Sequence, residues 1–207
     1  MGHVEGTSPD IAWPPANPGD SLGWIMSQSL AGQLLLASPS LLDPNFVRTV
    51  VLIGIHSEDG AMGVVLNRPS TVTVRDAVPQ LEDVVGALDP VYVGGPVQQS
   101  SVVFLAEFLE PSLAGTLVLG RIGFPAPDAG VQQLSEGTSR SRVFAGHAGW
   151  GAGQLDAEIE GGDWITHPAQ PQDVFTDVPD ELWSSVLTRM GGSYALIARM
   201  PLDPSVN

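Results

Sequence analysis

The sequence that decides the fold is Thr49-Val50-Val51-Leu52-Ile53-Gly54-Ile55, followed by the turn Ser57-Glu58-Asp59-Gly60 and by Ala61-Met62-Gly63-Val64-Val65-Leu66. The first segment is rich in β-branched residues, which are typical of strands. Asp-Gly pairs supply the positive φ angles of tight hairpin turns. The stretch therefore predicts a buried β-hairpin, which Asn67-Arg68-Pro69-Ser70 closes.

Further strands and short helices are predicted on both sides of this hairpin. Short apolar runs predict strands at 34–37, 91–93, 102–105, 116–119, 142–145, 163–166 and 195–200. Capping residues and helical spacing predict helices that begin at Asp43 and Thr73 and helices that span 128–134, 154–160 and 179–190. Strands that come partly as hairpins and partly with helices between them favour an α+β fold with mixed sheets over a doubly wound parallel fold.

The beginning of the chain differs in composition from this central part. Four prolines and several glycines interrupt residues 1–28, so this segment is predicted to be a disordered or loosely docked tail. Trp13 and Trp24 leave docking open, because large aromatic side chains can pin a tail to a surface groove. Residues 29–207 are predicted to form one domain, since single domains commonly reach ~200 residues.

The charge balance is strongly acidic. Among 207 residues there are 23 acids and 8 bases, which gives a net charge of −15, and every base is an arginine. Nucleic-acid backbones and anionic membranes recruit clustered Lys and Arg, whereas the densest cluster here is the pair Arg140 and Arg142. We therefore expect neither direct nucleic-acid binding nor membrane binding, and solubility is the ordinary explanation of the acidity.

Several classes of chemistry are excluded by what the sequence lacks. Cysteine is absent, so no disulfide, thiolate nucleophile or Cys-ligated metal can form. There is no Gly-x-Ser-x-Gly nucleophile elbow. No apolar run approaches the ~20 residues of a membrane helix, and residues 1–17 lack the basic start and apolar core of a secretory signal. We expect a cytoplasmic protein.

Four motifs stand in order along residues 32–200: Pro39-x-Leu41-x-Asp43-Pro44-x-Phe46, Gly60-Ala61-Met62-Gly63-Val64-Val65-Leu66-Asn67-Arg68-Pro69, Gly94-Gly95-Pro96-Val97, and Gly149-Trp150-Gly151-Ala152-Gly153-Gln154-Leu155-Asp156-x-Glu158-Ile159 with Trp164 after it. Together they resemble the YqgE/AlgH family of bacterial proteins. Two features depart from the family's pattern. His147 stands where an aromatic residue, commonly tyrosine, is expected, and the tail before Gln28 lies outside the pattern.

The resemblance implies a compact α+β fold in which mixed, mostly antiparallel sheets curl into a pseudo-barrel with flanking helices. It brings no catalytic mechanism, because the family is largely uncharacterised. The AlgH name implies a link to the regulation of alginate production, as a transcriptional regulator, but it specifies no binding chemistry.

A glycine-rich turn is predicted at 149–153, before the helix at 154–160. The backbone N–H groups of such a turn can bind a phosphate or a carboxylate, which makes Trp150, Gly151 and Gln154 candidate ligand-binding residues. The alternative is a tight turn that packs Trp150 into the core. The acids of the following helix are interpreted as a solvated face rather than as a carboxylate site.

Three histidines have acidic residues near them in the sequence: His56, His147 and His167. No pair of them has the close spacing typical of zinc ligands, so ordinary polar packing is the better interpretation. No metal or cofactor is predicted. His147 nevertheless stays among the candidate ligand-binding residues.

Arg48, Arg68 and Arg75 follow the first two motifs. If the fold brings them together, their guanidinium groups would form an anion-binding pocket with bidentate donors; separate structural salt bridges are the alternative. Arg48 and Arg68, with Gly94 and Gly95 of the third motif, complete the candidate ligand-binding residues.

The leading hypothesis for function is a non-enzymatic binding or regulatory module that acts through a protein partner or a small anionic ligand. The alternative is an enzyme acting on a small anionic metabolite at a pocket formed by Arg68 and the loops 94–96 and 149–154. A deep pocket joining these segments, with ionisable groups of shifted pKa, would favour the enzyme. A flat apolar patch there would favour the module. The sequence leaves the oligomeric state open.

Overall fold

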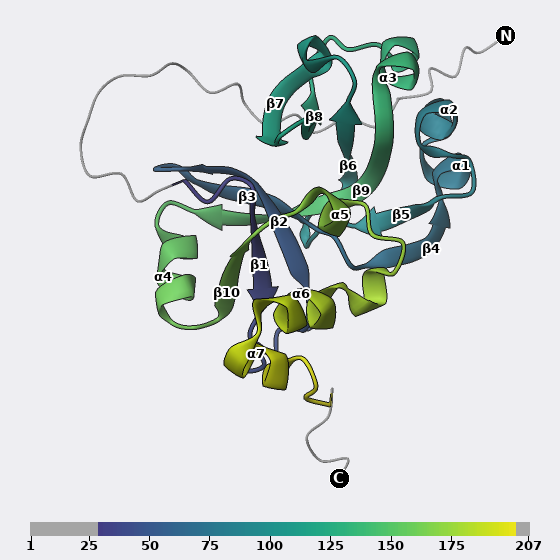
Figure 1. Ribbon diagram of the computed structural model, residues 1–207. Helices are drawn as coiled ribbons and strands as arrows, with labels where there is room; N and C mark the ends of the chain where they lie inside the picture. The colour runs from purple at the N-terminus through teal and green to yellow at the C-terminus, as the bar shows by residue number, and fades with distance from the viewer. Residues whose placement is uncertain (1–28, 202–207) are drawn as a thin grey trace, which may run out of the picture.

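The computed structural model describes residues 29–201, which form ten strands in one curled sheet with seven short α-helices around it (Figure 1). The strands are β1 (Gln33–Ala37), β2 (Val50–Ser57), β3 (Gly60–Val65), β4 (Pro69–Thr73), β5 (Pro90–Val93), β6 (Val97–Phe108), β7 (Ala114–Leu119), β8 (Ile122–Pro125), β9 (Thr138–Gly151) and β10 (Trp164–Pro168). The helices are α1 (Val74–Ala77), α2 (Glu82–Val85), α3 (Val131–Gly137), α4 (Gln154–Glu160), α5 (Pro171–Val174), α6 (Leu182–Met190) and α7 (Gly192–Ile197). The expected tail and the docking of its tryptophans lie outside the described residues.

The strand order is β10-β1-β2-β3-β9-β6-β8-β7, with β4 and β5 attached to the side of β9. All strand pairs are antiparallel except β5 with β9, which is parallel. The predicted α+β fold with a mixed, mostly antiparallel sheet and flanking helices is therefore confirmed.

The central hairpin forms where the sequence predicts it. β2 and β3 pair in antiparallel register down to Ser57 and Gly60 at the turn. The register shifts between Ile53 and Ile55, and at the intervening Gly54 the ring of Phe124 from β8 occupies the place of a β-carbon. β8 therefore packs directly against β2, which curls the sheet into a half-barrel.

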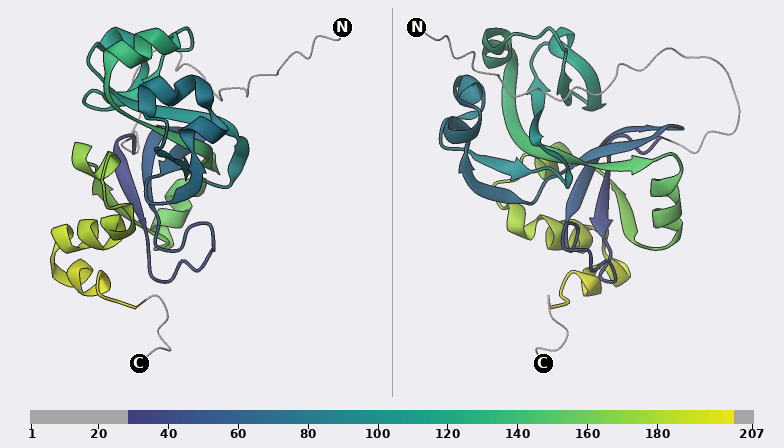
Figure 2. Two further views of the ribbon diagram at one scale, coloured as in Figure 1. Left: turned by 90° about the vertical axis from the view of Figure 1, so that its right-hand side faces the viewer. Right: turned by 180° about the vertical axis from the view of Figure 1, so that it is seen from behind.

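Three apolar clusters hold the fold together. The largest fills the inside of the curl, where side chains of the sheet meet α6; among its members are Leu52, Phe144 and Trp183. A second cluster lies on the opposite face of β1–β3, under α4. A third joins α1, α2 and α3 to β6 and β9. In Figure 2, α3 and the strands β6–β8 lie at one end of the molecule, and α6 and α7 lie at the other.

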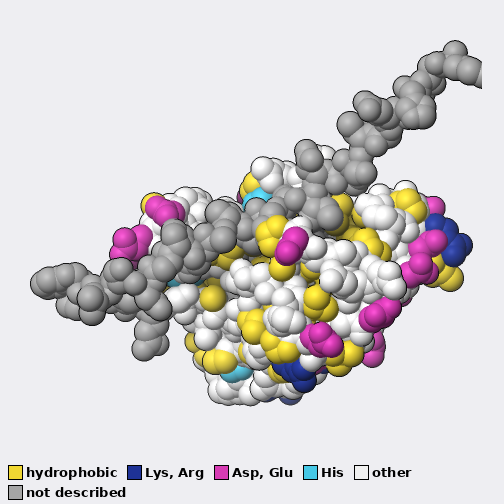
Figure 3. All heavy atoms as spheres, turned by 90° about the horizontal axis from the view of Figure 1, so that it is seen from above, with side chains coloured by type: hydrophobic (Ala, Val, Ile, Leu, Met, Phe, Trp, Pro, Cys, Tyr) yellow, Lys and Arg dark blue, Asp and Glu magenta, His cyan; other side chains and the backbone are white. Residues whose placement is uncertain are grey.

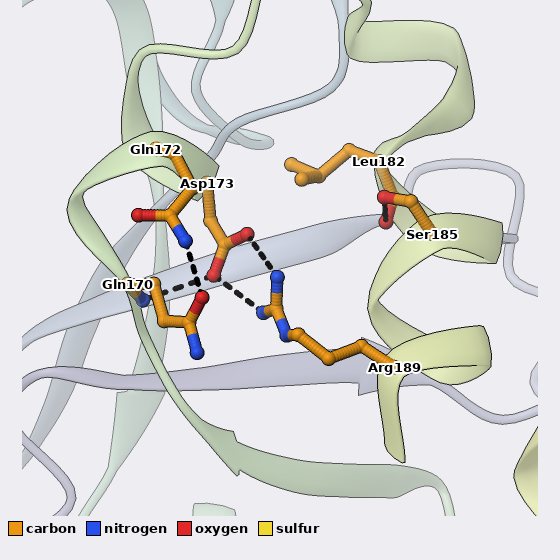
Figure 4. A network of polar contacts seen from close by, with 6 residues as sticks. All are labelled: Gln170, Gln172, Asp173, Leu182, Ser185 and Arg189. Atoms are coloured by element: carbon orange, nitrogen blue, oxygen red, sulfur yellow. Dashed lines mark hydrogen bonds and ion pairs between the residues drawn. The ribbon is translucent and has the colours of Figure 1, made fainter. Parts of the chain in front are cut away.

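An ion pair ties α6 to α5 (Figure 4). The Nη1 and Nη2 atoms of Arg189 lie 2.8 and 2.7 Å from the two carboxylate oxygens of Asp173. The backbone N–H of Gln170 donates to the same carboxylate at 2.9 Å. The Asp173 side chain is only 3% exposed, so its charge depends on these partners rather than on water.

Two predicted elements are wrong. Residues 195–200 do not form a strand, because α7 begins directly after the glycines that end α6, and Ile197 packs onto the core as part of a helix. Asp43 does not start a helix. Its carbonyl accepts from the N–H of Phe46, and its side chain accepts from the N–H of Asn45. The chain nevertheless continues as turns, because the Phe46 ring packs against Trp150 and Trp164 of the second cluster.

Other elements have different bounds from those predicted. β9 extends over 14 residues, far beyond 142–145, and β4 and β8 form where no strand is predicted. The predicted cap of α1 is confirmed, since the Thr73 hydroxyl accepts from the N–H of Asp76.

No helix within residues 29–201 combines the length and apolar character that a membrane crossing requires. On the face shown in Figure 3, acidic side chains are scattered among uncharged and hydrophobic ones, and arginine is confined to separate places.

Candidate functional site

Two of the three arginines that were candidates for an anion pocket line the same hollow. Arg48 and Arg68 border a space of about 370 Å³ beside α6. The Arg48 guanidinium lies 4.7 Å from the ring centre of Trp183, and the Arg68 Nη2 donates to the Val47 carbonyl at 2.6 Å. Arg75 lies apart, because its Nε donates to Glu82 at 3.2 Å. The three-arginine pocket is therefore reduced to two arginines.

Asn67 holds the backbone at this hollow. Its Oδ1 accepts from the N–H of Val50, and its Nδ2 donates to the Arg48 carbonyl, both at 2.9 Å. Arg48 has a φ of +53°, a left-handed conformation that is uncommon for residues other than glycine. The asparagine beside Arg68 thus fixes the loop from which the Arg48 side chain projects.

A second hollow joins Arg68 to the glycine loop. Its volume is about 260 Å³, and Arg68, Gly95 and Pro96 are among its lining residues. The loop at 149–154 does not line it. The enzyme alternative requires a pocket that joins Arg68 to the loops 94–96 and 149–154. This hollow joins Arg68 to the first loop only.

Gly94 and Gly95 have a structural role at this place. The N–H of Gly94 donates to Ala145 of β9, and its carbonyl accepts from Val65 of β3, both at 2.9 Å. Gly95 has a φ of +154°, and a β-carbon there would overlap the backbone of His147. These glycines let two backbone segments pack without a side chain between them.

Trp150, Gly151 and Gln154 lie in a hydrogen-bonded cluster around Glu158. Gly149, Trp150 and Gly151 end β9, so the predicted turn is shorter than expected. The Glu158 Oε2 accepts from the indole N–H of Trp150 at 2.8 Å and from that of Trp164 at 2.9 Å. Its Oε1 accepts from the amide of Gln154 at 2.9 Å. The carboxylate is thus occupied by internal donors.

We expect Glu158→Gln to lower the free energy of unfolding by about 1–2 kcal/mol. The amide retains one acceptor oxygen but turns an NH₂ donor toward other donors, and it loses the charge that strengthens these bonds. Urea titration followed by tryptophan fluorescence measures the effect. The control is Glu160→Gln, the same change on an exposed residue of α4; equal destabilisation by both variants would contradict the role of this cluster.

His147 lies on β9 beside the crossing at Gly95. Its Nδ1 is buried and has no hydrogen-bond partner within residues 29–201. Burial lowers the pKa of His147, because a charged imidazole would lose hydration there. Across the same part of the chain, no group of three or more His, Asp or Glu side chains has a metal-binding arrangement.

A larger hollow lies elsewhere, where β5 and β9 meet α2 and the segment that follows α5. We call it the arginine cleft. It has a volume of about 600 Å³, and its lining residues are Pro69, Val84, Val85, Asp89, Pro90, Tyr92, Ser139, Arg140, Ser141, Arg142, Phe175, Thr176, Asp177 and Pro179. This volume lies within the range of small-molecule sites, about 300–1,000 Å³.

Two guanidinium groups from β9 lie on aromatic rings in this cleft. Arg142 is 4.4 Å from the ring centre of Tyr92, and Arg140 is 4.8 Å from that of Phe175. Residues two apart on a strand point to the same face, which explains why both arginines reach the cleft. Arg140 also pairs with Glu107, whose Oε2 lies 2.9 Å from the arginine Nε.

Arg142 has no carboxylate within ion-pair distance in the described part of the chain. Its Nη1 donates to the carbonyl of Val174 at 2.9 Å and, at 3.5 Å, to that of Leu66, and its Nη2 donates to that of Thr176. Burial lowers the pKa of its guanidinium. Nε takes part in none of these bonds. The cleft therefore contains a half-buried cation that keeps free donor capacity.

From the sequence alone, Arg140 and Arg142 form only a weak basic cluster. The i, i+2 spacing on a strand was a usable signal, because it places both side chains on one face. The aromatic residues beneath them and the segment 174–177 come from distant parts of the chain, which no local pattern indicates.

Comparison with known proteins gives one consistent match. The model of a family described as AlgH-like matches residues 34–195. A UPF0301 protein of Streptomyces coelicolor is 41% identical over 191 residues, covering 89% of this chain and 99% of that protein. A UPF0301 protein of Thermobifida fusca is 40% identical, covering 86% of this chain and 96% of that protein.

Two solved structures are also similar. The crystal structure of a protein from Corynebacterium diphtheriae has a TM-score of 0.74 and 33% identity, and the match covers 82% of this chain and 91% of that one. The solution structure of the AlgH protein from Pseudomonas aeruginosa has a TM-score of 0.65 and 32% identity, with 87% and 98% covered.

Proposed function

Because the chain belongs to the AlgH-like family, we propose that it is a cytoplasmic, non-enzymatic binding module that holds a small anionic ligand in the arginine cleft. The observation that carries the proposal is Arg142, a half-buried guanidinium without a carboxylate partner among the described residues, in the wall of a cleft of about 600 Å³.

The chemistry of the cleft suits such a ligand. A guanidinium presents several N–H donors in one plane and matches carboxylate and phosphate oxygens. The carbonyls of Val174 and Thr176 hold the Arg142 side chain in place, so little conformational entropy remains to be lost when an anion binds. Partial burial strengthens the attraction by lowering the local dielectric.

A regulatory role would be carried by a protein partner in this proposal. The net charge of −15 opposes direct contact with DNA, whereas a ligand in the arginine cleft would contact the segment 175–177 between the sheet and α6. Ligand binding would thereby stabilise the surface around that segment.

A thermal-shift screen against nucleotides, sugar phosphates and metal ions tests the proposal. A ligand at 100 times its Kd stabilises a protein by about 2.7 kcal/mol, which such a screen detects. Turnover of a ligand that binds would replace the binding module with the enzyme alternative.

Arg142→Met is expected to weaken binding of the best anionic ligand at least about tenfold, because a hydrogen bond to a charged group contributes about 1.5–3 kcal/mol. Arg140→Met is the second variant, since it lines the same cleft without binding the 174–176 backbone. Arg121→Met, at the β7–β8 turn outside the cleft, is the control for loss of one positive charge. Calorimetric Kd values that change equally in all three variants would refute the site.

A further inference from the structure

The arginine cleft carries charges of both signs. Asp89 and Asp177 line it together with Arg142. Both aspartates are exposed, whereas Arg142 is half-buried, so the acids form the rim and the guanidinium lies deeper. The two sides differ in origin, since Asp89 directly precedes β5 and Asp177 follows α5.

Hydrogen bonds hold the backbone of Asp89 and the residue before Asp177. The N–H of Asp89 donates to Gly86 at 3.2 Å, and its carbonyl accepts from Val74 at 2.9 Å. Asp177 follows Thr176, whose carbonyl accepts from Arg142 and whose hydroxyl accepts from the N–H of Val178 at 3.2 Å. Neither carboxylate accepts a hydrogen bond from another group among residues 29–201. Both carboxylates are therefore unoccupied acceptors at the mouth of the cleft.

The charges of Asp89 and Asp177 act on the side chains at the bottom of the cleft. Burial raises the pKa of the Tyr92 phenol, and the negative charges of Asp89 and Asp177 act in the same direction. Burial lowers the pKa of Arg142, and the two aspartates oppose that change. Both acids are thus close enough to influence the aromatic ring and the guanidinium at the bottom of the cleft.

A count of formal charge decides which ligands fit. Glu107 pairs with Arg140 at 2.9 Å, which leaves Arg142 as a cation that no carboxylate of residues 29–201 contacts, facing two acids at the rim. Arg142 would attract a purely anionic ligand, but Asp89 and Asp177 would repel it. A ligand that also carries a positive group toward the rim is attracted both by Arg142 and by the two aspartates.

We propose that the ligand of the arginine cleft is a zwitterion, with an anionic group at Arg142 and a protonated amine at Asp89 and Asp177. This inference rests on the proposed function, because it specifies the ligand class of the same cleft. The amine would donate to the two carboxylates while the anionic end accepts from the guanidinium.

The test compares four probes at mildly acidic pH, where an amino sugar is protonated: glucosamine 6-phosphate, glucose 6-phosphate, glucosamine and inorganic phosphate. The first two differ only in an amine that replaces a hydroxyl. Exposed ion pairs contribute about 0.2–1 kcal/mol each, so the two pairs of the amine are expected to make glucosamine 6-phosphate bind about two- to thirtyfold more tightly than glucose 6-phosphate by calorimetry. Glucosamine and inorganic phosphate should each bind more weakly than either sugar phosphate.

The double variant Asp89→Asn/Asp177→Asn should abolish the preference for the amine while binding of glucose 6-phosphate is retained or improved. The matched control is Glu136→Gln/Glu160→Gln, which removes two negative charges from exposed sites outside the cleft and should leave the preference intact.

Each further outcome overturns a distinct claim. Equal Kd values for the two sugar phosphates, both weakened by Arg142→Met, would overturn the zwitterion and leave the anion site standing. Inorganic phosphate binding as tightly as glucosamine 6-phosphate would do the same. Absence of binding by all four probes would overturn the proposed function together with this inference.

Discussion

Replacing Arg189 by leucine is expected to lower the free energy of unfolding by about 3 kcal/mol. The change leaves the Asp173 carboxylate, which is 3% exposed, with the N–H of Gln170 as its remaining partner (Figure 4). Removing one member of a buried ion pair costs about 3–5 kcal/mol, because the other charge stays buried without compensation. The lower end applies here, since the Arg189 side chain is 30% exposed.

Urea denaturation followed by circular dichroism measures this loss. Arg199→Leu is the matched control, because Arg199 is exposed and forms no ion pair within the described range; it should change stability by less than about 0.5 kcal/mol. A loss below about 1 kcal/mol for Arg189→Leu would show that the pair does not hold α6 against α5.

Gly95→Ala is expected to destabilise the protein by more than about 3 kcal/mol or to prevent folding. At its φ of +154° an L-residue is strained, and the new β-carbon would overlap the carbonyl of His147 and the N–H of Ala148. These are backbone atoms of β9, and His147 is paired with Val97, so they cannot move aside without breaking the sheet.

Gly153→Ala separates this steric effect from the loss of a glycine as such. Gly153 has a φ of +70°, but within residues 29–201 no atom beyond its two chain neighbours lies within 4 Å of the position that a β-carbon would take there. Its cost should be limited to the left-handed conformation, about 1–2 kcal/mol. The yield of soluble protein and the denaturation midpoint compare the two variants; similar values would contradict the close crossing at Gly95.

The elements that the sequence predicts correctly are those with a strong local signal. The β2–β3 hairpin follows from β-branched runs on either side of Asp59-Gly60. The Thr73 cap follows from side-chain chemistry within four residues. The predicted strand at 195–200 failed because its apolar residues are equally compatible with a short helix, and packing against the core selected the helix.

Among the candidate site residues too, the sequence predicts features with a local signal and misses those set by tertiary contacts. Arg48 and Arg68 share a hollow, as one interpretation of the sequence required, and Gly95 lines the neighbouring one. Trp150 is buried, as the alternative interpretation of the glycine-rich turn held. No local pattern could reveal that Glu158 binds both Trp150 and Trp164, because that contact depends on how α4 folds back between β9 and β10.

The sequence by itself determined the fold class, the central hairpin, the absence of cysteine chemistry and the excess of negative charge, because each depends on composition or on residues close together in the chain. Only the tertiary structure decided where the arginines point. Arg142 contacts Tyr92 from β5 and the carbonyls of Val174 and Thr176 at the end of α5. Tyr92 and Val174 lie 50 and 32 residues away from it in the sequence. The arginine cleft exists because the curled sheet brings those segments together, and curvature of this kind is set by packing across the whole core rather than by any local pattern.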